Sequence, residues 1–395
     1  MGNSYVFDFD KIVDRNNTNC LKYDFKAERG LPADVLPLWV ADMDFPTVPE
    51  VTEKLKSVAN HGIFGYTEVK DDYFDAVSGW FLKHFNWETK KEWLVKTPGV
   101  VYAIAQAVRA FSKEGDGVML QNPVYYPFSE VIVDNNRKLV NSPLLYNPEG
   151  DGYDYTMNFE EIEEKIVSEN VKIFLLCNPH NPVGRVWSRE ELTRLGDICN
   201  RHNVLVVSDE IHCDFTYEGF NHTVYASLGR EYEKNCIVCT APSKTFNLAG
   251  LQVSNIFIPN ADIRKKFLRE LRSTGYSQLN TCGLYAAQTA YESGELWLSQ
   301  LKEYIAGNLL LVRSFVNERL KGIRLIEPQG TYLVWLDCSG LGISDEELNN
   351  RIVNKAGLWL DAGNVFGKEG DNFQRINIAC PRSVLLEALE RLTKI

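Results

Sequence analysis

The sequence lacks the features that would assign it to a membrane, a secretory route or a nucleic acid. No stretch approaches the roughly 18 apolar residues of a membrane-spanning helix. The first ten residues, MGNSYVFDFD, contain no basic segment and no long apolar segment, so we expect no signal peptide; Tyr5, Val6 and Phe7 predict the start of a folded segment. No basic block interrupts a formal net charge of -11, which argues against a nucleic-acid surface. We expect a cytoplasmic protein without membrane or nucleic-acid partners.

The cysteines do not follow the spacing of a disulfide framework or a metal site. Nine cysteines are scattered along the chain, and Cys236 and Cys239 form the one CxxC pair. No second pair of ligands accompanies it, and its surroundings predict a strand. Cys177 and Cys199 also lie in apolar runs, where a free thiol behaves as a small apolar side chain. We expect buried thiols in a reducing compartment and no metal.

Nucleotide-binding glycine motifs, internal repeats and flexible linkers are also missing. There is no G-x-G-x-x-G between a strand and a helix and no G-x-x-x-x-G-K-[ST]. The chain has 395 residues, of which 45% are hydrophobic and 24% are charged, as in an ordinary globular protein of two domains. Without a flexible linker, the domains are expected to pack together, with the ligand site where they meet.

The pattern of apolar residues predicts an α/β fold, a mostly parallel sheet flanked by helices. Residues 171–177 are a continuous apolar run, typical of a strand buried on both faces, and residues 203–209 predict the next strand. Between them, Ser188 and Glu191 form a capping box before a helix. This order of strand, helix and strand predicts a right-handed parallel unit. The same pattern predicts strands at 118–121 and 252–258 and helices beginning near residue 100 and spanning 261–273.

The C-terminal part predicts a smaller α+β domain. Residues 331–337 and 374–379 alternate between apolar and polar, as in strands with one solvent-exposed face. A long helical stretch over residues 294–320 is expected to connect the two parts. We therefore expect a large domain over residues 47–290 and a small domain formed by residues 1–46 and 291–395.

Lys244 lies in the segment SKTFN, residues 243–247, directly after the apolar run at 236–239. A lysine at a strand end, among small and polar residues, is well placed to be an amine that reacts with a carbonyl group. Pyridoxal-phosphate enzymes need such a lysine as a Schiff base, with an acidic partner for the pyridinium nitrogen. A solvated loop lysine is the alternative for this segment alone.

Other polar side chains follow the predicted strands. Asp209 ends one strand, where a carboxylate needs a partner such as a pyridinium nitrogen; a helix N-cap is the alternative. His212 would lie one helical turn from Asp209. Asn181, in NPHNPVG, is placed to direct its amide at a ligand beyond the strand ends, although this loop also has the composition of a rigid turn.

Three further positions have both a functional and a structural interpretation. Gly99 opens a predicted helix, whose free N–H groups would suit a phosphate. Tyr125 follows a strand end and either stacks on a flat ring or packs in the core. Arg375 either binds a ligand carboxylate through two parallel hydrogen bonds or forms an ion pair with an acidic side chain that has a structural role.

Together these segments resemble the fold-type-I pyridoxal-phosphate enzymes, the aspartate aminotransferase superfamily, over nearly the whole chain. Within it they are most similar to the cystathionine β-lyase branch, the MalY/PatB-type C–S lyases that include cystalysin. The segments that carry this resemblance are LWVADMDF at 38–45, GYT at 65–67, PVYYPF at 123–128, NPHNPVGRVW at 178–187 and SDEIH at 208–212.

The resemblance implies a pyridoxal 5'-phosphate site and a role for each matching residue. Lys244 matches the Schiff-base lysine, and Asp209 the partner of the pyridinium nitrogen. Asn181 matches the residue that bonds the ring hydroxyl, with His212 nearby. Tyr125 matches the tyrosine that stacks on the ring and is grouped with Lys244 and Asp209 as catalytic.

The resemblance also implies phosphate and substrate contacts. The backbone amides of Val100 and Val101, together with Ser243, match phosphate ligands. Tyr66 matches a tyrosine that reaches the phosphate of a neighbouring subunit, which implies a homodimer with shared sites. Arg375 matches the arginine that binds the substrate α-carboxylate. The remaining expected substrate contacts are Tyr126 and Ala41.

Two positions depart from the pattern of many relatives. Gln252 stands where an arginine often binds the phosphate, and Ala241 where a serine often does. The reaction that the resemblance implies is α,β-elimination of cystathionine-type or cysteine-type amino acids to pyruvate, ammonia and a thiol, with Lys244 removing the Cα proton. An aminotransferase, or a regulatory protein that retains the fold, are the alternatives, and the preferred thioether is not predicted.

Overall fold

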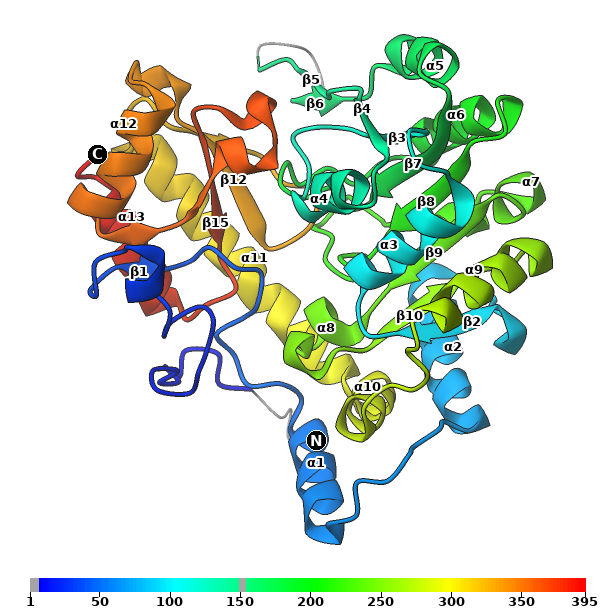
Figure 1. The fold of residues 1–395 in the computed structure, drawn as a ribbon. Helices are drawn as coiled ribbons and strands as arrows, with labels where there is room; N and C mark the ends of the chain where they lie inside the picture. Colours follow the sequence, from blue (N-terminus) through cyan, green and yellow to red (C-terminus); the bar gives the residue numbers. More distant parts are fainter. Residues whose placement is uncertain (1–6, 149–153) are drawn as a thin grey trace.

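A seven-stranded sheet forms the centre of the larger part of the molecule in the computed structural model, which describes residues 7–148 and 154–395 (Figure 1). Tyr5 and Val6, expected to begin a folded segment, lie outside the described residues. The strand order is β2 (Leu94–Thr97), β10 (Ser254–Phe257), β9 (Cys236–Thr240), β8 (Leu205–Asp209), β7 (Val171–Cys177), β3 (Gly117–Leu120) and β4 (Lys138–Asn141). Only β10 is antiparallel to its neighbours in this sheet, so the predicted mostly parallel sheet is confirmed.

The predicted strand–helix–strand unit is present. β7 has the predicted bounds, and β8 begins two residues later than predicted because Asn203 takes a positive φ of 56° in the preceding turn. Helix α6 (Arg189–Arg201) lies between them, and both bonds of the capping box form between Ser188 and Glu191. Helices α3 (Val100–Phe111) and α9 (Ala261–Ser273) also confirm the prediction.

Both faces of the large sheet are buried. Alternate residues of β7 enter different core clusters: Ile173 and Leu175 pack with α3 and α9, whereas Phe174 and Leu176 pack with residues of α6. A strand covered on two sides has no solvent-exposed face, which explains its continuous apolar run.

A second sheet forms the smaller part, and one prediction for it is wrong. Its strand order is β11 (Arg324–Ile326), β12 (Leu333–Asp337), β15 (Phe373–Asn377) and β14 (Asp361–Ala362), all antiparallel. Every residue of β12 and β15 is buried, although one exposed face was expected. One face packs on the larger part: Trp335 of β12, which stacks on Phe373 of β15, donates from Nε1 to the Tyr155 hydroxyl of the larger part at 3.2 Å.

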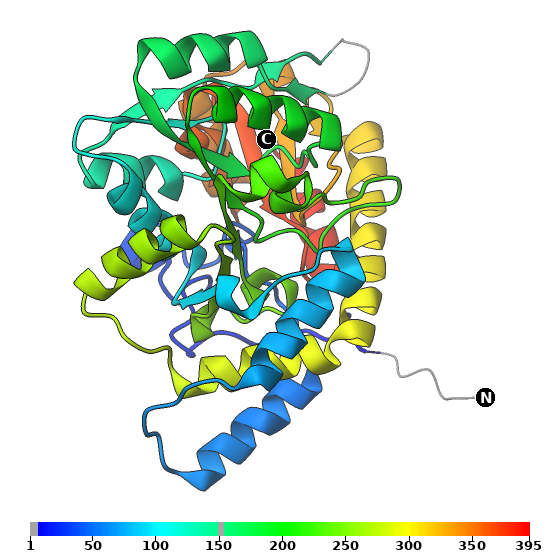
Figure 2. The same cartoon turned by 90° about the vertical axis from the view of Figure 1, so that its right-hand side faces the viewer.

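Helix α11 (Glu295–Arg319) covers both parts of the molecule, as predicted for residues 294–320. It runs from α10 (Thr281–Ser293) beneath the large sheet to the small sheet (Figures 1 and 2). Asn308 on α11 donates from Nδ2 to the carbonyl oxygens of Ile378 and Cys380, both at 2.9 Å, and so holds the helix against the smaller part. No helix in the described ranges has the length and apolar character needed to cross a membrane.

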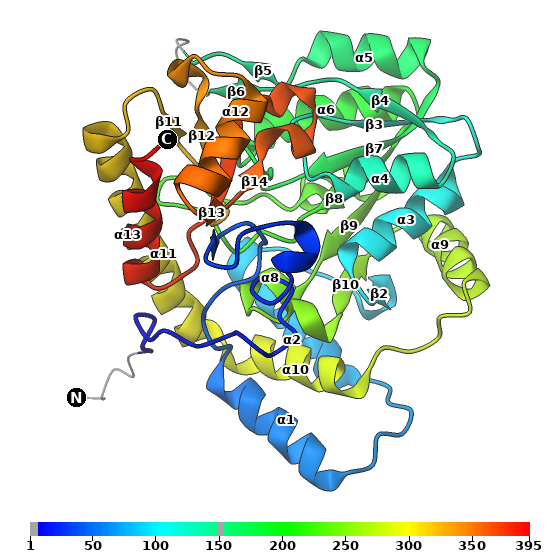
Figure 3. The same cartoon turned by 60° about the vertical axis from the view of Figure 1, so that its left-hand side comes forward.

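The N-terminal segment connects the two parts near the ends of the large sheet. Strand β1 (Leu36–Pro37) pairs in parallel with β13 (Leu358–Trp359) of the smaller part. The chain then passes close to helix α8 (Pro242–Thr245) before it enters α1 (Pro49–His61), which projects from the body of the molecule (Figure 3). This path brings residues 39–45 next to the segment that contains Lys244.

Candidate active site

A cavity of about 170 Å³ lies at the carboxyl ends of strands β7, β8 and β9. Nine of the twelve predicted site residues line it: Ala41, Val100, Val101, Tyr125, Asn181, Asp209, His212, Ser243 and Lys244. The topology explains this convergence, because parallel strands end at the same edge of the sheet and the loops after them meet there. Asn181 follows β7, Asp209 ends β8, and Lys244 lies in α8 after β9.

Lys244 is a half-buried amine without a carboxylate partner in the described part of the chain. Its Nζ donates to the carbonyl oxygen of Ala41 at 3.0 Å. Burial lowers the pKa of this amine to about 8, with the positive charge of Arg375 acting in the same direction. A substantial fraction of Lys244 is therefore neutral near pH 8, and only the neutral amine attacks a carbonyl carbon or accepts a proton.

Asn247 places the carbonyl of Ala41 beside Lys244. Its Oδ1 accepts from the backbone N–H of Met43 at 3.0 Å, and its Nδ2 donates to the carbonyl oxygens of Met43 and Phe45 at 3.0 and 2.8 Å. The hydroxyl of Tyr332 donates to the same Ala41 oxygen at 3.0 Å. Neither Asn247 nor Tyr332 was assigned a role from the sequence, because their partners lie some 200 to 290 positions away.

Asp209 is a buried carboxylate that lacks a cationic partner. Its Oδ1 accepts from the backbone N–H of Ile211 at 3.1 Å, and no cationic side chain among the described residues forms an ion pair with it. Burial raises its pKa to about 7. Residues 211–214 form turns rather than a helix, so Asp209 is not a helix N-cap. A protonated ring nitrogen would supply the missing positive partner.

His212 and Asn181 add polar groups to the same cavity. Burial and the charges of Lys244 and Arg375 hold the pKa of His212 well below its usual range, so its imidazole is neutral. Its Nδ1 is buried and has no partner among the described residues. Asn181 accepts from Arg375 Nη1 at its Oδ1, at 3.0 Å, which leaves its Nδ2 as a donor to a ligand.

Tyr125 lines the cavity, and Tyr126 packs beside it. The backbone N–H of Tyr125 donates to the carbonyl oxygen of Asn181 at 3.1 Å, and its ring lines the cavity. Burial raises the pKa of its hydroxyl above the usual range, so it stays protonated. Tyr126 is half-buried and does not line the cavity; its ring centroid lies 5.4 Å from that of Tyr125.

The start of α3 offers free backbone donors. The first intrahelical bond runs from the N–H of Ala103 to the carbonyl of Gly99, so the N–H groups of Val100 and Val101 have no acceptor within the helix. Ser243 and Gln252 also line the cavity, whereas Ala241 is buried and contributes no polar group. Such a helix start suits a phosphate, and the individual phosphate roles remain predictions.

Arg375 reaches the site from the smaller part of the molecule. It is 2% exposed, and besides Asn181 it bonds to the carbonyl oxygen of Trp39 at 2.7 Å and to the carboxylate of Asp361. The ring of Phe366 lies 4.8 Å from its guanidinium carbon. The expected structural acid is thus present as Asp361, which the sequence did not single out.

Tyr66 lies away from the cavity. It is 98% exposed, in an extended segment between α1 and α2 (Asp71–Phe85). Within one chain it therefore contacts none of the other predicted site residues.

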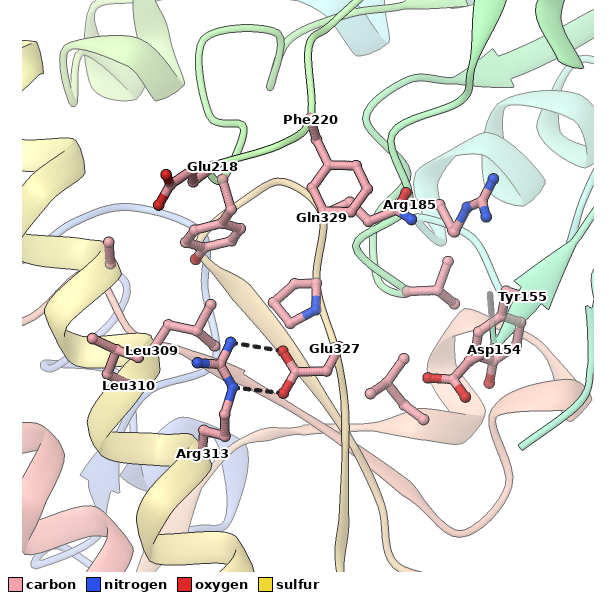
Figure 4. Close-up of a pocket in the computed structure, with 15 residues that line it drawn as sticks. Asp154, Tyr155, Arg185, Glu218, Phe220, Leu309, Leu310, Arg313, Glu327 and Gln329 are labelled. Atoms are coloured by element: carbon pink, nitrogen blue, oxygen red, sulfur yellow. Dashed lines mark hydrogen bonds and ion pairs between the residues drawn. The ribbon is translucent and has the colours of Figure 1, made fainter. Parts of the chain in front are cut away.

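A larger hollow, of about 490 Å³, lies elsewhere between the two parts and contains none of the predicted site residues (Figure 4). Two opposite charges of its lining pair with each other: Arg313 donates to both carboxylate oxygens of Glu327, at 2.7 and 2.8 Å. Volume alone therefore does not locate the site, whereas unpaired buried groups do. Within the described residues, no cluster of His, Cys, Asp or Glu is arranged to hold a metal ion, and Cys236 and Cys239 are buried free thiols of β9.

The unpaired groups of the smaller cavity fit pyridoxal 5'-phosphate. An amine for a carbonyl carbon, a carboxylate for a ring nitrogen, an amide donor for a ring hydroxyl and a helix start for a phosphate all line one space. Among the described residues, each of these groups lacks a full set of bonding partners, and pyridoxal 5'-phosphate has the matching group for each of them.

Comparison with known proteins gives relatives over the whole length. The family model described as aminotransferase class I and II matches residues 33–392. Cystathionine beta-lyase PatB of Bacillus subtilis is 42% identical over 97% of this chain and 98% of its own. A pyridoxal-phosphate-bound structure from Clostridium difficile 630, described as an inferred aminotransferase, has a TM-score of 0.95 and 43% identity over 98% of this chain and 99% of its own. Cystalysin from Treponema denticola, which contains pyridoxal 5'-phosphate, has a TM-score of 0.94 and 38% identity over 99% and 98%.

Proposed function

Because the chain belongs to the class I and II aminotransferase family, and within it to the cystathionine β-lyase branch, we propose that it is a pyridoxal-phosphate-dependent C–S lyase. Its substrates would be cystathionine-type or cysteine-type amino acids, which react with water to give pyruvate, ammonia and a thiol. The observation that carries the proposal is the presence of half-buried Lys244 and buried Asp209 in one cavity, neither with an ion-pair partner among the described residues.

The cofactor would be held by residues of this chain already in place around the cavity. Lys244 Nζ would bind its carbonyl carbon, Asp209 its ring nitrogen and Asn181 Nδ2 its ring hydroxyl. The amides of Val100 and Val101 would bind its phosphate, together with the groups named below. When bound, pyridoxal phosphate accepts the electron pair that remains on Cα after a proton is removed.

The other phosphate and ring contacts would come from the remaining lining residues. Ser243 and Gln252 would supply side-chain donors to the phosphate. They would do so in place of the serine that many relatives have at position 241 and the arginine that they have at position 252. Tyr125 would stack on the ring, and the neutral imidazole of His212 would lie near the ring hydroxyl.

The substrate would be positioned by one charge and deprotonated by one amine. Arg375 would bind the α-carboxylate, with Tyr126 and the Ala41 carbonyl along the same side of the site. Once the substrate amine has taken its place on the carbonyl carbon, Lys244 Nζ would be free to take the proton from Cα, and burial, which lowers its pKa to about 8, would keep it available as a neutral base. The buried surroundings would exclude water from this transfer.

The proposal is tested by measuring pyruvate release from cystathionine with no keto acid added. The wild-type protein should release pyruvate and a thiol in equal amounts, and Lys244→Ala should lower kcat/KM by at least roughly 10³-fold. Lys302→Ala is the matched control, because burial also lowers the pKa of Lys302 but its side chain lines a different cavity. Undiminished thiol release by Lys244→Ala would exclude the proposed function.

A second candidate, an aminotransferase, is favoured by the description of the Clostridium difficile relative. It would use the same cavity and the same Lys244 base, because the two reactions differ only after the Cα proton has been removed. An aminotransferase would consume the amino acid only in the presence of a keto acid and would release no thiol. The assay above therefore separates the two candidates.

We further propose that the protein is a cytoplasmic homodimer whose subunits share active sites. Supporting this, Ile63, Phe64 and Tyr66 are 70, 63 and 98% exposed in the segment after α1, and exposed apolar groups of this kind are typical of interfaces. Tyr66 would reach the phosphate site of the partner subunit. The nine free cysteines support a reducing compartment.

The domain division that we propose is residues 47–290 for the large domain and residues 1–46 with 291–395 for the small domain. The seven-stranded sheet, which lies within 94–257, and the four-stranded sheet, which lies within 324–377, support this division. The pairing of β1 with β13 supports the assignment of the N-terminal segment to the small domain.

A further inference from the structure

The guanidinium of Arg375 already holds a carboxylate. Asp361 and Arg375 are directly opposite each other on the antiparallel strands β14 and β15, so the register of the small sheet brings the two charges together. The Asp361 carboxylate bonds to Nη2 of Arg375, and the two side chains are 11% and 3% exposed. Arg375 is the residue expected to bind the substrate α-carboxylate, so its charge is compensated before any substrate arrives.

The hydrogen-bond positions of Arg375 show which contact a substrate must displace. A guanidinium grips a carboxylate with two parallel bonds either through Nη1 and Nη2 or through Nε and Nη2, so both arrangements need Nη2. Both hydrogens of Nη2 are in use, one by the carbonyl of Trp39 and one by Asp361. Nε has no partner among the described residues, and Nη1 donates to Asn181. No two-bonded grip is available until Nη2 is released.

Of the two acceptors at Nη2, Asp361 is the one that can leave by a side-chain rotation. The Trp39 carbonyl belongs to the backbone, and its neighbours are fixed: the Leu38 N–H donates to Trp359 O, and Asn377 donates to Val40 O. Arg29 is a second cation near Asp361: burial raises the pKa of that carboxyl group, and the positive charge of Arg29 acts to lower it. Its guanidinium carbon lies 4.9 and 5.5 Å from the centroids of the stacked rings of Trp39 and Trp359.

We propose that Asp361 is a specificity-determining residue that competes with the substrate α-carboxylate for Arg375 and is exchanged for it when substrate binds. The proposal rests on the proposed function, since it takes Arg375 as the carboxylate clamp. The exchange forms two bonds between the substrate carboxylate and Arg375 and breaks the one between Asp361 and Nη2. Asp361 lowers the affinity for every carboxylate ligand and favours those that can make both bonds.

A purely structural role for Asp361 predicts the opposite sign. If Asp361 only held Arg375 in place, loss of its charge would loosen the clamp and weaken carboxylate binding. If Asp361 competes, the same loss removes a charge-assisted bond, which is roughly twice as strong as a neutral one, and binding becomes tighter. Asp361→Asn separates the two, because the amide keeps the shape and an acceptor oxygen but carries no charge.

The first experiment is calorimetric titration of the holoenzyme with 3-(methylthio)propanoate, a carboxylate without the amino group needed for reaction. Asp361→Asn should bind it about tenfold more tightly than the wild type, and KM for cystathionine should fall by a similar factor at unchanged kcat. Glu327→Gln is the matched control: it removes the carboxylate from the Arg313 pair of Figure 4 and should change neither value. Equal or weaker binding by Asp361→Asn would overturn the proposal.

A crystal structure of the wild-type holoenzyme with 3-(methylthio)propanoate tests the exchange without a substitution. The bound carboxylate should occupy Nη2 of Arg375 and Asp361 should have left it; a complex in which Asp361 keeps this bond would overturn the proposal even if the variant failed to fold. The proposed function is tested separately by wild-type pyruvate release. If the wild type binds the carboxylate but releases no pyruvate, the lyase proposal fails while the result for Asp361 still stands.

Discussion

Among the individual residues, burial shifts the pKa values of the site more than the charged groups shift the pKa values of one another. Desolvation is the first cause of the shifted pKa of both Lys244 and Asp209, and their mutual attraction is the last. The cavity thus holds an amine that deprotonates near pH 8 and a carboxylate that is ionised only above about pH 7, and each lacks a bonded counter-ion. A cationic ring nitrogen would pair with the buried carboxylate of Asp209. The free-energy penalty of burying this carboxylate without a partner would then be removed, which favours binding of the cofactor.

The same cost predicts a pH-dependent gain in stability for Asp209→Asn in the cofactor-free protein. The pKa of Asp209 is raised from 3.8 to about 7, so the folded state binds more protons than the unfolded state between these values. The free energy of unfolding therefore falls as pH rises through this range, and the variant escapes this loss. The advantage of the variant should grow by roughly 2 kcal/mol between about pH 5 and pH 8, measured by urea unfolding. A constant difference between variant and wild type would contradict the prediction.

Among the elements, the order of strands and loops could be predicted from the sequence because each depends on neighbouring residues. The apolar run of β7 and the capping box of α6 are local signals, and both are confirmed. Asp209 and Asn181 could be placed at the sheet edge for the same reason, since one ends a buried strand and the other lies in the loop just after one.

Contacts between distant segments could not be predicted in this way. Asn247 binds Met43 across 204 positions, and Tyr332 binds Ala41 across 291. The ion pair of Arg375 with Asp361 depends on the register of β14 and β15, which the sequence does not display. The exposed face expected for β12 and β15 was wrong because packing on the larger part covers it.

Helix α3 allows its phosphate donors to be tested one at a time. Val100 is the first helical residue, where proline is tolerated because its missing N–H has no intrahelical acceptor. Gly99 before it is extended, at φ 173° and ψ 159°, as a residue that precedes proline should be. Val100→Pro should therefore keep the fold and weaken binding of pyridoxal phosphate about tenfold, through loss of one charge-assisted bond.

Val100→Ala is the control for this change, because it removes the side chain and keeps the N–H. Both dissociation constants are measured by fluorescence titration of the cofactor-free protein, with thermal unfolding to confirm that each variant is folded. If Val100→Pro binds as tightly as Val100→Ala, the N–H of Val100 is not a phosphate donor.

In the whole molecule, the position of Tyr66 distinguishes a shared active site from a site complete within one chain. Tyr66 is 98% exposed and lines a surface hollow beside α10 instead of the cavity that contains Lys244. If it serves the partner subunit, Tyr66→Ala and Lys244→Ala should each be impaired alone. Mixing them under conditions of subunit exchange should then restore activity, because one site of each mixed dimer has both native residues. Random pairing makes half of the dimers mixed, so about a quarter of wild-type activity should return. Analytical ultracentrifugation checks that dimers are present, and no recovery in a mixture that exchanges subunits would place Tyr66 outside the partner's site.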